Sequence, residues 1–190
     1  MNTPESLFST RWLGIYRIGT WDYVRRPQTN SCVGILAETD DQEIVLIEQF
    51  RIPVQSRVIE IPAGLVGDEE EEHLASPPCS LPDIENGEDF SEDYLRETAR
   101  RELLEETGYD AASVVKLIRT PTSAGMTSEF THLFHATGLT KRHDGGGIGG
   151  EKITVHLVPR ANLRTWLKQK ENEGLVLDFK IHAALWLAGL

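Results

Sequence analysis

Three glutamates close together in the chain are the residues best placed to do chemistry. Glu102, Glu105 and Glu106 lie three and four positions apart, directly after Arg101. On an α-helix this spacing puts side chains on one face, where like charges repel. A hard divalent cation, which prefers oxygen ligands, would turn that repulsion into binding, and Arg101 could pair with Glu105 one turn on. The alternative is a solvated acidic face, which is the commoner fate of a run of charges.

The residues around this cluster extend it into a longer pattern. The pattern is Gly87-x5-Asp93-x7-Arg101-Glu102-Leu103-x-Glu105-Glu106-x-Gly108. It resembles the Nudix box, the signature of hydrolases that cleave nucleoside diphosphates linked to another moiety, with Asp93 where the family has glutamate. Residues 21–26, 48–51, 60–64, 122–126 and 151–158 are similar to segments of the ADP-ribose and nucleoside-diphosphate-sugar pyrophosphatase branch. The resemblance runs from about Trp12 to the C-terminus.

The resemblance implies a metal site and a catalytic set. It implies Mg²⁺, with Mn²⁺ as a substitute, held by the three glutamates and by the backbone carbonyl of Ala63. From its residues alone, the segment Pro62-Ala63-Gly64 would be an ordinary turn. Arg101 and Glu105 belong to the catalytic set. The family places the general base on a loop before the last strand, and Glu151 occupies that position after a glycine-rich run at 145–150. Glu129 is the rival for the base and could instead hold the distal sugar, while Glu151 could be a solvated residue at the start of a strand.

A nucleotide base would be bound near the N-terminus. In this branch two aromatic residues sandwich the adenine, and Trp21 and Trp12 resemble that pair. Asp22 could accept a hydrogen bond from the base or ribose. The alternative for either tryptophan is an ordinary place in the core.

The phosphates and the sugar would contact a second group of residues. Arg51 and Arg26 are the expected phosphate contacts, because the guanidinium fork suits phosphate oxygens. Surface salt bridges are the competing interpretation for both. The resemblance also places Gly125 and Met126 at the substrate, together with Glu129.

The elements that must position these residues mix strands with a few helices. Alternating apolar and polar residues predict two strands within 10–26, with Gly19 at the turn. Residues 31–38 and 43–50 are predicted to form a hairpin, and further strands are predicted at 57–61, 114–119, 130–136 and 153–158. Helices are predicted at 91–107, 161–172 and 179–188, with Ser91 and Asp178 as N-caps and Gly108 after the first helix. This order favours an α+β protein. The resemblance sharpens it to a Nudix fold: an α/β/α sandwich of mixed sheets with a short N-terminal antiparallel β segment.

The chain is expected to divide at about residue 30. Residues 1–30 form N-terminal strands, which the branch exchanges between subunits, so we expect a homodimer. Residues 31–190 form the Nudix hydrolase domain. Residues 65–86 interrupt it as an acidic, proline-containing insertion, for which a loop is predicted.

Composition narrows the class of partner. Lysine and arginine number 19 against 30 aspartates and glutamates, a net charge of −11. So acidic a chain has no broad attraction for nucleic acid or anionic lipid, and an anionic substrate would need a local cation. No apolar run reaches the ~20 residues of a membrane span, and no signal peptide is apparent. Two cysteines are too few for a disulfide framework, and we expect a cytoplasmic protein.

The predicted function is Mg²⁺-dependent hydrolysis of the diphosphate linkage of ADP-ribose or a related nucleoside diphosphate sugar. ADP-ribose would give AMP and ribose 5-phosphate. Cleavage of GDP-mannose, another sugar nucleotide or a dinucleotide is the alternative, because Ala124 stands where ADP-ribose-specific members carry proline. A second alternative is a non-catalytic Nudix-like module that senses a nucleotide.

Overall fold

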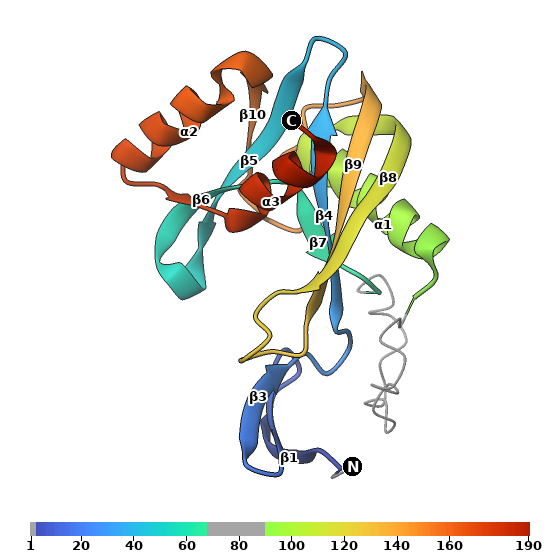
Figure 1. Ribbon diagram of the computed structural model, residues 1–190, viewed down its shortest axis with the longest axis vertical. Coiled ribbons are helices and arrows are strands. Elements are labelled where there is room, and N and C mark those ends of the chain that lie inside the picture. The colour runs from blue at the N-terminus through green and yellow to red at the C-terminus, as the bar shows by residue number, and fades with distance from the viewer. Residues whose placement is uncertain (1–2, 68–89) are drawn as a thin grey trace.

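The computed structural model describes residues 3–67 and 90–190. Most of the predicted insertion at 65–86, and Gly87 at the start of the box, lie outside the described residues. The described part contains one three-stranded sheet, one eight-stranded sheet and three α-helices, which pack on the larger sheet (Figure 1).

The N-terminal sheet is antiparallel and lies at one end of the molecule (Figure 1). It consists of β1 (Glu5–Ser9), β2 (Gly14–Ile18) and β3 (Trp21–Arg25). Gly19 makes the β2–β3 turn with φ 61°, a left-handed conformation that glycine adopts readily. The predicted pair of strands is therefore present, and β1 is an additional strand that the sequence pattern did not reveal.

The large sheet combines antiparallel and parallel pairs. Its strands are β4 (Ser31–Glu38), β5 (Glu43–Arg51), β6 (Ser56–Glu60), β7 (Ala63–Leu65), β8 (Tyr109–Pro121), β9 (Phe130–Lys141), β10 (Thr154–Pro159) and β11 (Val176–Leu177). The main order is β11-β6-β5-β4-β9-β8, with β10 on β5 and β7 on β4. The β4–β9 and β11–β6 pairs are parallel, and the other pairs are antiparallel.

Helices cover both faces of this sheet. Successive residues of β4 point to opposite faces, so Ile35 packs toward α1 (Glu92–Thr107) while Leu36 packs toward α2 (Leu163–Asn172) and α3 (Phe179–Ala188). The result is two separate apolar cores, one on each side of the sheet. The predicted α/β/α sandwich with mixed strands is confirmed.

The predicted helix ends are confirmed by their capping contacts. The Ser91 hydroxyl accepts a hydrogen bond from the Tyr94 backbone N–H at 3.3 Å, and Gly108 ends α1 with φ 76°. Asp178 caps α3 by accepting from the Lys180 N–H at 2.7 Å. The helix predicted at 161–172 begins with a short 3₁₀ turn, Arg160–Asn162, and a second 3₁₀ turn, Ile52–Val54, follows β5. No helix in the described ranges is long and apolar enough to cross a membrane.

Candidate active site

The last two turns of α1 bury two carboxylates. Glu102 is 8% exposed and Glu106 is 4% exposed, although ionised side chains seldom leave water unless they are paired. Gly64 of β7 makes room for them: a Cβ there would overlap the Glu102 carboxyl group, so a larger residue would displace that carboxyl group from its present position. The Ala63 backbone N–H donates to Glu106 Oε2 at 2.9 Å. The Pro-Ala-Gly segment is therefore part of the site's wall.

Arg101 holds the neighbouring carboxylates. Its Nη2 lies 2.7 Å from Glu102 Oε1, and its Nη1 donates to Glu105 Oε2 at 2.9 Å. The expected i,i+4 pair with Glu105 is present, and one guanidinium bridges two of the three glutamates. Glu105 is the more exposed of the two bridged carboxylates.

Burial raises the pKa of Glu106 to about 8. The Ala63 N–H and Arg51 act in the opposite direction, while the negative charges of Glu102 and Glu151 add to the increase. Glu151 and Arg51, which come from a loop and from the end of β5, thus act electrostatically on the α1 cluster. A carboxylate in this position requires a proton or a cation for its charge to be tolerated.

The glycine-rich loop before β10 is anchored on the C-terminus of α1. The backbone N–H groups of Gly146 and Gly147 donate to the carbonyls of Glu106 and Glu105 at 2.9 and 3.2 Å. These carbonyls belong to the last turn, which has no intrahelical donor for them. Further along the loop, the Ile148 N–H donates to Glu151 Oε2 at 3.1 Å. The loop therefore ties Glu151 to the end of the helix that carries the cluster.

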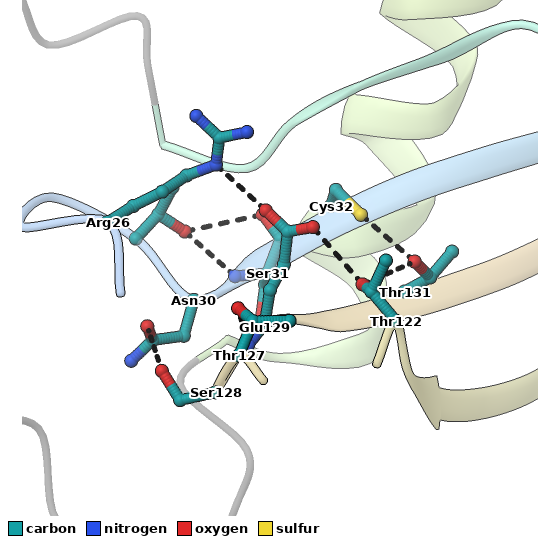
Figure 2. A network of polar contacts seen from close by, with 10 residues as sticks. Arg26, Asn30, Ser31, Cys32, Thr122, Thr127, Ser128, Glu129 and Thr131 are labelled. Atoms are coloured by element: carbon teal, nitrogen blue, oxygen red, sulfur yellow. Dashed lines mark hydrogen bonds and ion pairs between the residues drawn. The ribbon is translucent and has the colours of Figure 1, made fainter. Parts of the chain in front are cut away.

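A second polar network lies between the N-terminal sheet and the loop that joins β8 to β9 (Figure 2). Arg26 Nε donates to Glu129 Oε2 at 2.8 Å, and the Thr122 hydroxyl donates to Glu129 Oε1 at 3.1 Å. Thr122 also contacts Thr131, which lies beside Cys32. Both carboxylate oxygens of Glu129 have partners, which distinguishes it from Glu151.

The other predicted substrate contacts occupy different surroundings. Arg51 pairs with the buried Glu60 at 2.8 Å, so the salt bridge considered for it is present, as is the one considered for Arg26. Asp22 makes a two-point contact with Arg17, which lowers the pKa of that carboxyl.

The predicted aromatic and sugar contacts are exposed. Trp12 and Trp21 lie at the surface of the N-terminal sheet, and Trp12 packs against the Arg11 guanidinium. Gly125 and Met126 lie in the β8–β9 loop, and the Met126 carbonyl accepts from the Val24 N–H at 2.8 Å. This bond places the loop beside β3.

Two contributors to the site had not been identified from their own residue types. Glu60 holds Arg51, and Gly64 accommodates Glu102. Both lie in the segment 60–64, whose resemblance to the family was the available signal. The contacts with Arg51 and Glu102 explain why these two residue types stand there.

The donor set fits a hard divalent cation. Among residues 3–67 and 90–190, no three His, Cys, Asp or Glu side chains are arranged to hold a metal ion by themselves. Mg²⁺ characteristically uses one or two carboxylates and completes its shell with water and substrate phosphate. The buried pair Glu102 and Glu106, with the raised pKa of Glu106, is consistent with that chemistry.

Comparisons with known proteins place this geometry in a family. The chain is 35% identical over 132 residues to the methanol dehydrogenase activator of Bacillus methanolicus, covering 70% of this chain and 57% of that protein. It is 31% identical over 145 residues to the ADP-ribose pyrophosphatase of Bacillus subtilis, covering 72% and 64%. It is 27% identical over 159 residues to the GDP-mannose pyrophosphatase of Cronobacter sakazakii, covering 80% and 69%. The match thus spans less than two thirds of the length of the first two relatives.

A solved structure confirms the fold. A crystal structure of an ADP compounds hydrolase superposes with a TM-score of 0.66 at 19% identity, covering 98% of this chain and 89% of that one. A sequence model of the NUDIX domain matches residues 28–175, which include α1, β7 and the glycine-rich loop. With most of its length matched by that model, the chain belongs to the NUDIX domain family.

Proposed function

We propose that this protein hydrolyses the diphosphate linkage of ADP-ribose or a related nucleoside diphosphate sugar in a Mg²⁺-dependent reaction. The observation that carries the proposal is the pair of buried carboxylates, Glu102 and Glu106, on the helix that matches the family. Relatives named ADP-ribose pyrophosphatase and GDP-mannose pyrophosphatase support the substrate class.

The metal would be held where the charge is buried. Glu102 and Glu106 are the proposed ligands, with Glu105 and the Ala63 carbonyl beside them. Bound Mg²⁺, or Mn²⁺ in its place, would neutralise phosphate charge and lower the pKa of a bound water. Arg101 positions the glutamates by bridging Glu102 and Glu105.

Glu151 is the proposed general base. It acts on Glu106 electrostatically, and the loop that carries it is anchored on α1. The base would take a proton from water as the water oxygen attacks one phosphorus and the bridging P–O bond breaks. The products are two phosphate monoesters, AMP and ribose 5-phosphate in the case of ADP-ribose. Glu129 is the weaker candidate because its oxygens are held by Arg26 and Thr122.

The remaining residues would bind the two ends of the substrate. Arg51, which acts on Glu106, is proposed to contact the phosphates, and its guanidinium retains donors beyond the pair with Glu60. Gly125, Met126 and Glu129, in the β8–β9 loop, would contact the same substrate, together with Arg26, which follows β3.

The N-terminal sheet is the proposed dimer and base-binding element. Residues 1–30 would act beside the Nudix domain of residues 31–190. Large apolar side chains on this sheet face solvent, including Phe8, which is 62% exposed, and Trp21, which is 61% exposed. Several large apolar side chains exposed on one small sheet are typical of an interaction site. A second subunit would cover part of it, and a nucleotide base would stack on Trp21 or Trp12 with Asp22 nearby.

Product analysis tests the proposal. Purified protein with Mg²⁺ is offered ADP-ribose, GDP-mannose, UDP-glucose, NADH and a dinucleoside polyphosphate, and the nucleotides are separated by chromatography. AMP from ADP-ribose, or the monophosphate of another nucleotide sugar, is expected from the wild-type protein and from Glu97→Gln, a control at an exposed position of α1. Glu106→Gln should give almost no product. Metal and nucleotide binding without cleavage of any substrate would contradict the proposal and favour the sensor.

A further inference from the structure

A groove lies on the face of the large sheet opposite α1. It is formed by side chains of α2 and α3 and has a volume of about 780 Å³. Pockets of roughly 300–1,000 Å³ are the size that takes small organic ligands. The carboxylates of α1 pack on the other core, so the groove is separated from them by the sheet.

The floor of the groove is aliphatic and one wall is aromatic. Leu163, Leu167, Leu177 and Leu185 line it, and the first two are almost fully buried. Trp186 forms part of the wall and is 83% exposed, although it belongs to a helix whose other face packs in the core. An indole left this open beside a leucine floor provides a flat apolar surface.

The groove also carries cations, on a chain whose net charge is −11. Three cationic side chains line it beside one carboxylate, Glu171: they are Arg160, Arg164 and Lys168. Arg160 is paired with Glu38 at 2.9 Å, and Lys168 with Glu171 at 2.6 Å. Arg164 is exposed and forms no ion pair with any residue of the described ranges. Its guanidinium is thus available to an anion from outside.

We propose that this groove binds an amphipathic organic anion, whose apolar body lies on the leucines and Trp186 and whose oxyanion head contacts Arg164. The positive charge of Arg164 at the groove's edge favours a ligand with an anionic head over one with a cationic head. The leucine floor favours an alkyl chain or aromatic ring over a sugar or a nucleotide, whose hydroxyls and phosphates would lose water without gaining partners. The ligand is therefore of a different class from a nucleoside diphosphate sugar.

Decanoate is the probe that tests this proposal, with decyltrimethylammonium as the matched cation. Both are titrated below their micellar concentrations, with calorimetry for affinity and the indole N–H resonance of Trp186 as the local reporter. Decanoate should bind one molecule per chain and shift the Trp186 resonance. Decyltrimethylammonium should bind at least about tenfold more weakly, as expected for loss of a charge-assisted contact.

Two charge reversals on α2 separate the groove from a general charge effect. Arg164→Glu should weaken decanoate binding about tenfold or more, whereas Lys170→Glu, on the same helix but outside the groove, should leave it nearly unchanged. Trp186→Ala, at an exposed position, should weaken it as well. Equal binding of the two probes, equal effects of the two reversals, or competitive displacement by ADP-ribose would overturn the proposal.

Discussion

Two regions depart from the ordinary rule of burial in opposite directions. The C-terminal half of α1 buries carboxylates, while the N-terminal sheet exposes large apolar side chains such as Phe8 and Trp21. Buried charge costs free energy unless it is compensated, and exposed apolar surface gives up the free energy that burial would provide. A bound cation would compensate the buried charge of the first region, and a second surface packed on the N-terminal sheet would bury the apolar side chains of the second.

The two regions also differ in how firmly they are attached. The α1 cluster is enclosed by Gly64, the Ala63 N–H and the glycine-rich loop, so its geometry is fixed by the domain itself. The N-terminal sheet connects to the domain through the Val24 backbone bonds and the Arg26–Glu129 pair. Chemistry is expected where the geometry is fixed, and recognition where a partner can complete the surface.

The largest effect that sharpens this comparison concerns the two candidate bases. Glu151→Gln should lower kcat by about 10²-fold or more, in the range of lost general base catalysis. Glu129→Gln should lower kcat by less than about tenfold and act mainly on KM, because it releases Arg26 without removing the base. Steady-state kinetics on the preferred substrate compares the two. A larger loss of kcat in Glu129→Gln than in Glu151→Gln would identify Glu129, in the β8–β9 loop, as the general base.

A smaller effect is expected from charging the exposed sheet. Phe8→Lys should shift a dimer toward monomer and weaken association about tenfold or more, since about 1.5–3 kcal/mol accompanies burial of such a side chain. Ser9→Lys, at an exposed polar position of the same strand, is the matched control. Analytical ultracentrifugation over a concentration series measures both. A wild-type protein that stays monomeric at every concentration would show that the N-terminal sheet is not a dimer interface.

Removing the buried charge of Glu106 should stabilise the metal-free protein. Because the folded-state pKa is about 8, above the ordinary 4.5, the folded state binds more protons between those pH values and stability falls as pH rises through that window. Glu106→Gln should remove that loss and raise Tm at pH 8 by several degrees, at about 2–4 °C per kcal/mol. Little change is expected at pH 5. A lower Tm for the variant at pH 8, measured by calorimetry in a chelator, would argue against a destabilising charge.

The smallest expected effect is on the pH dependence of stability, and it comes from His132, a buried polar residue outside both regions. His132 is buried and its pKa falls to about 4, first because of burial and then because of Lys116 and Arg119. The unfolded state binds the proton more readily, so stability should decrease as pH falls from about 6.5 to 4. His132→Gln should reduce the slope of the unfolding free energy against pH by an amount that corresponds to at most one bound proton. Urea unfolding at several pH values measures the slope, and an unchanged slope would show that His132 does not titrate in this way.

The sequence predicted the elements whose signals are local. Ser91, the dense helix formers and Gly108 define α1 within one stretch of chain, and Asp178 does the same for α3. The facing glutamates followed from helical spacing alone. The apolar runs of β4 and β5, which are buried on both faces of the sheet, are equally local.

The features that escaped prediction depend on partners far away in the chain. β7 and β11 have three and two residues and exist through pairing with β4 and β6. The Arg26–Glu129 pair joins residues 103 positions apart. The contact between Gly64 and the Glu102 carboxyl group likewise needs the tertiary fold. Spacing indicated which residues could act, whereas their burial and pairing became visible only in three dimensions.

The most direct test of the central claim is Mg²⁺ binding measured together with turnover. Wild-type protein, Glu106→Gln and the exposed control Glu97→Gln are titrated with Mg²⁺ by calorimetry, and AMP release from ADP-ribose is followed across the same concentrations. Product should appear in proportion to bound Mg²⁺ in the wild type and in Glu97→Gln. Glu106→Gln should bind Mg²⁺ weakly and lose turnover by about 10²- to 10³-fold or more. Equal Mg²⁺ affinity and turnover in all three proteins would contradict the claim that the buried carboxylates of α1 hold the catalytic metal.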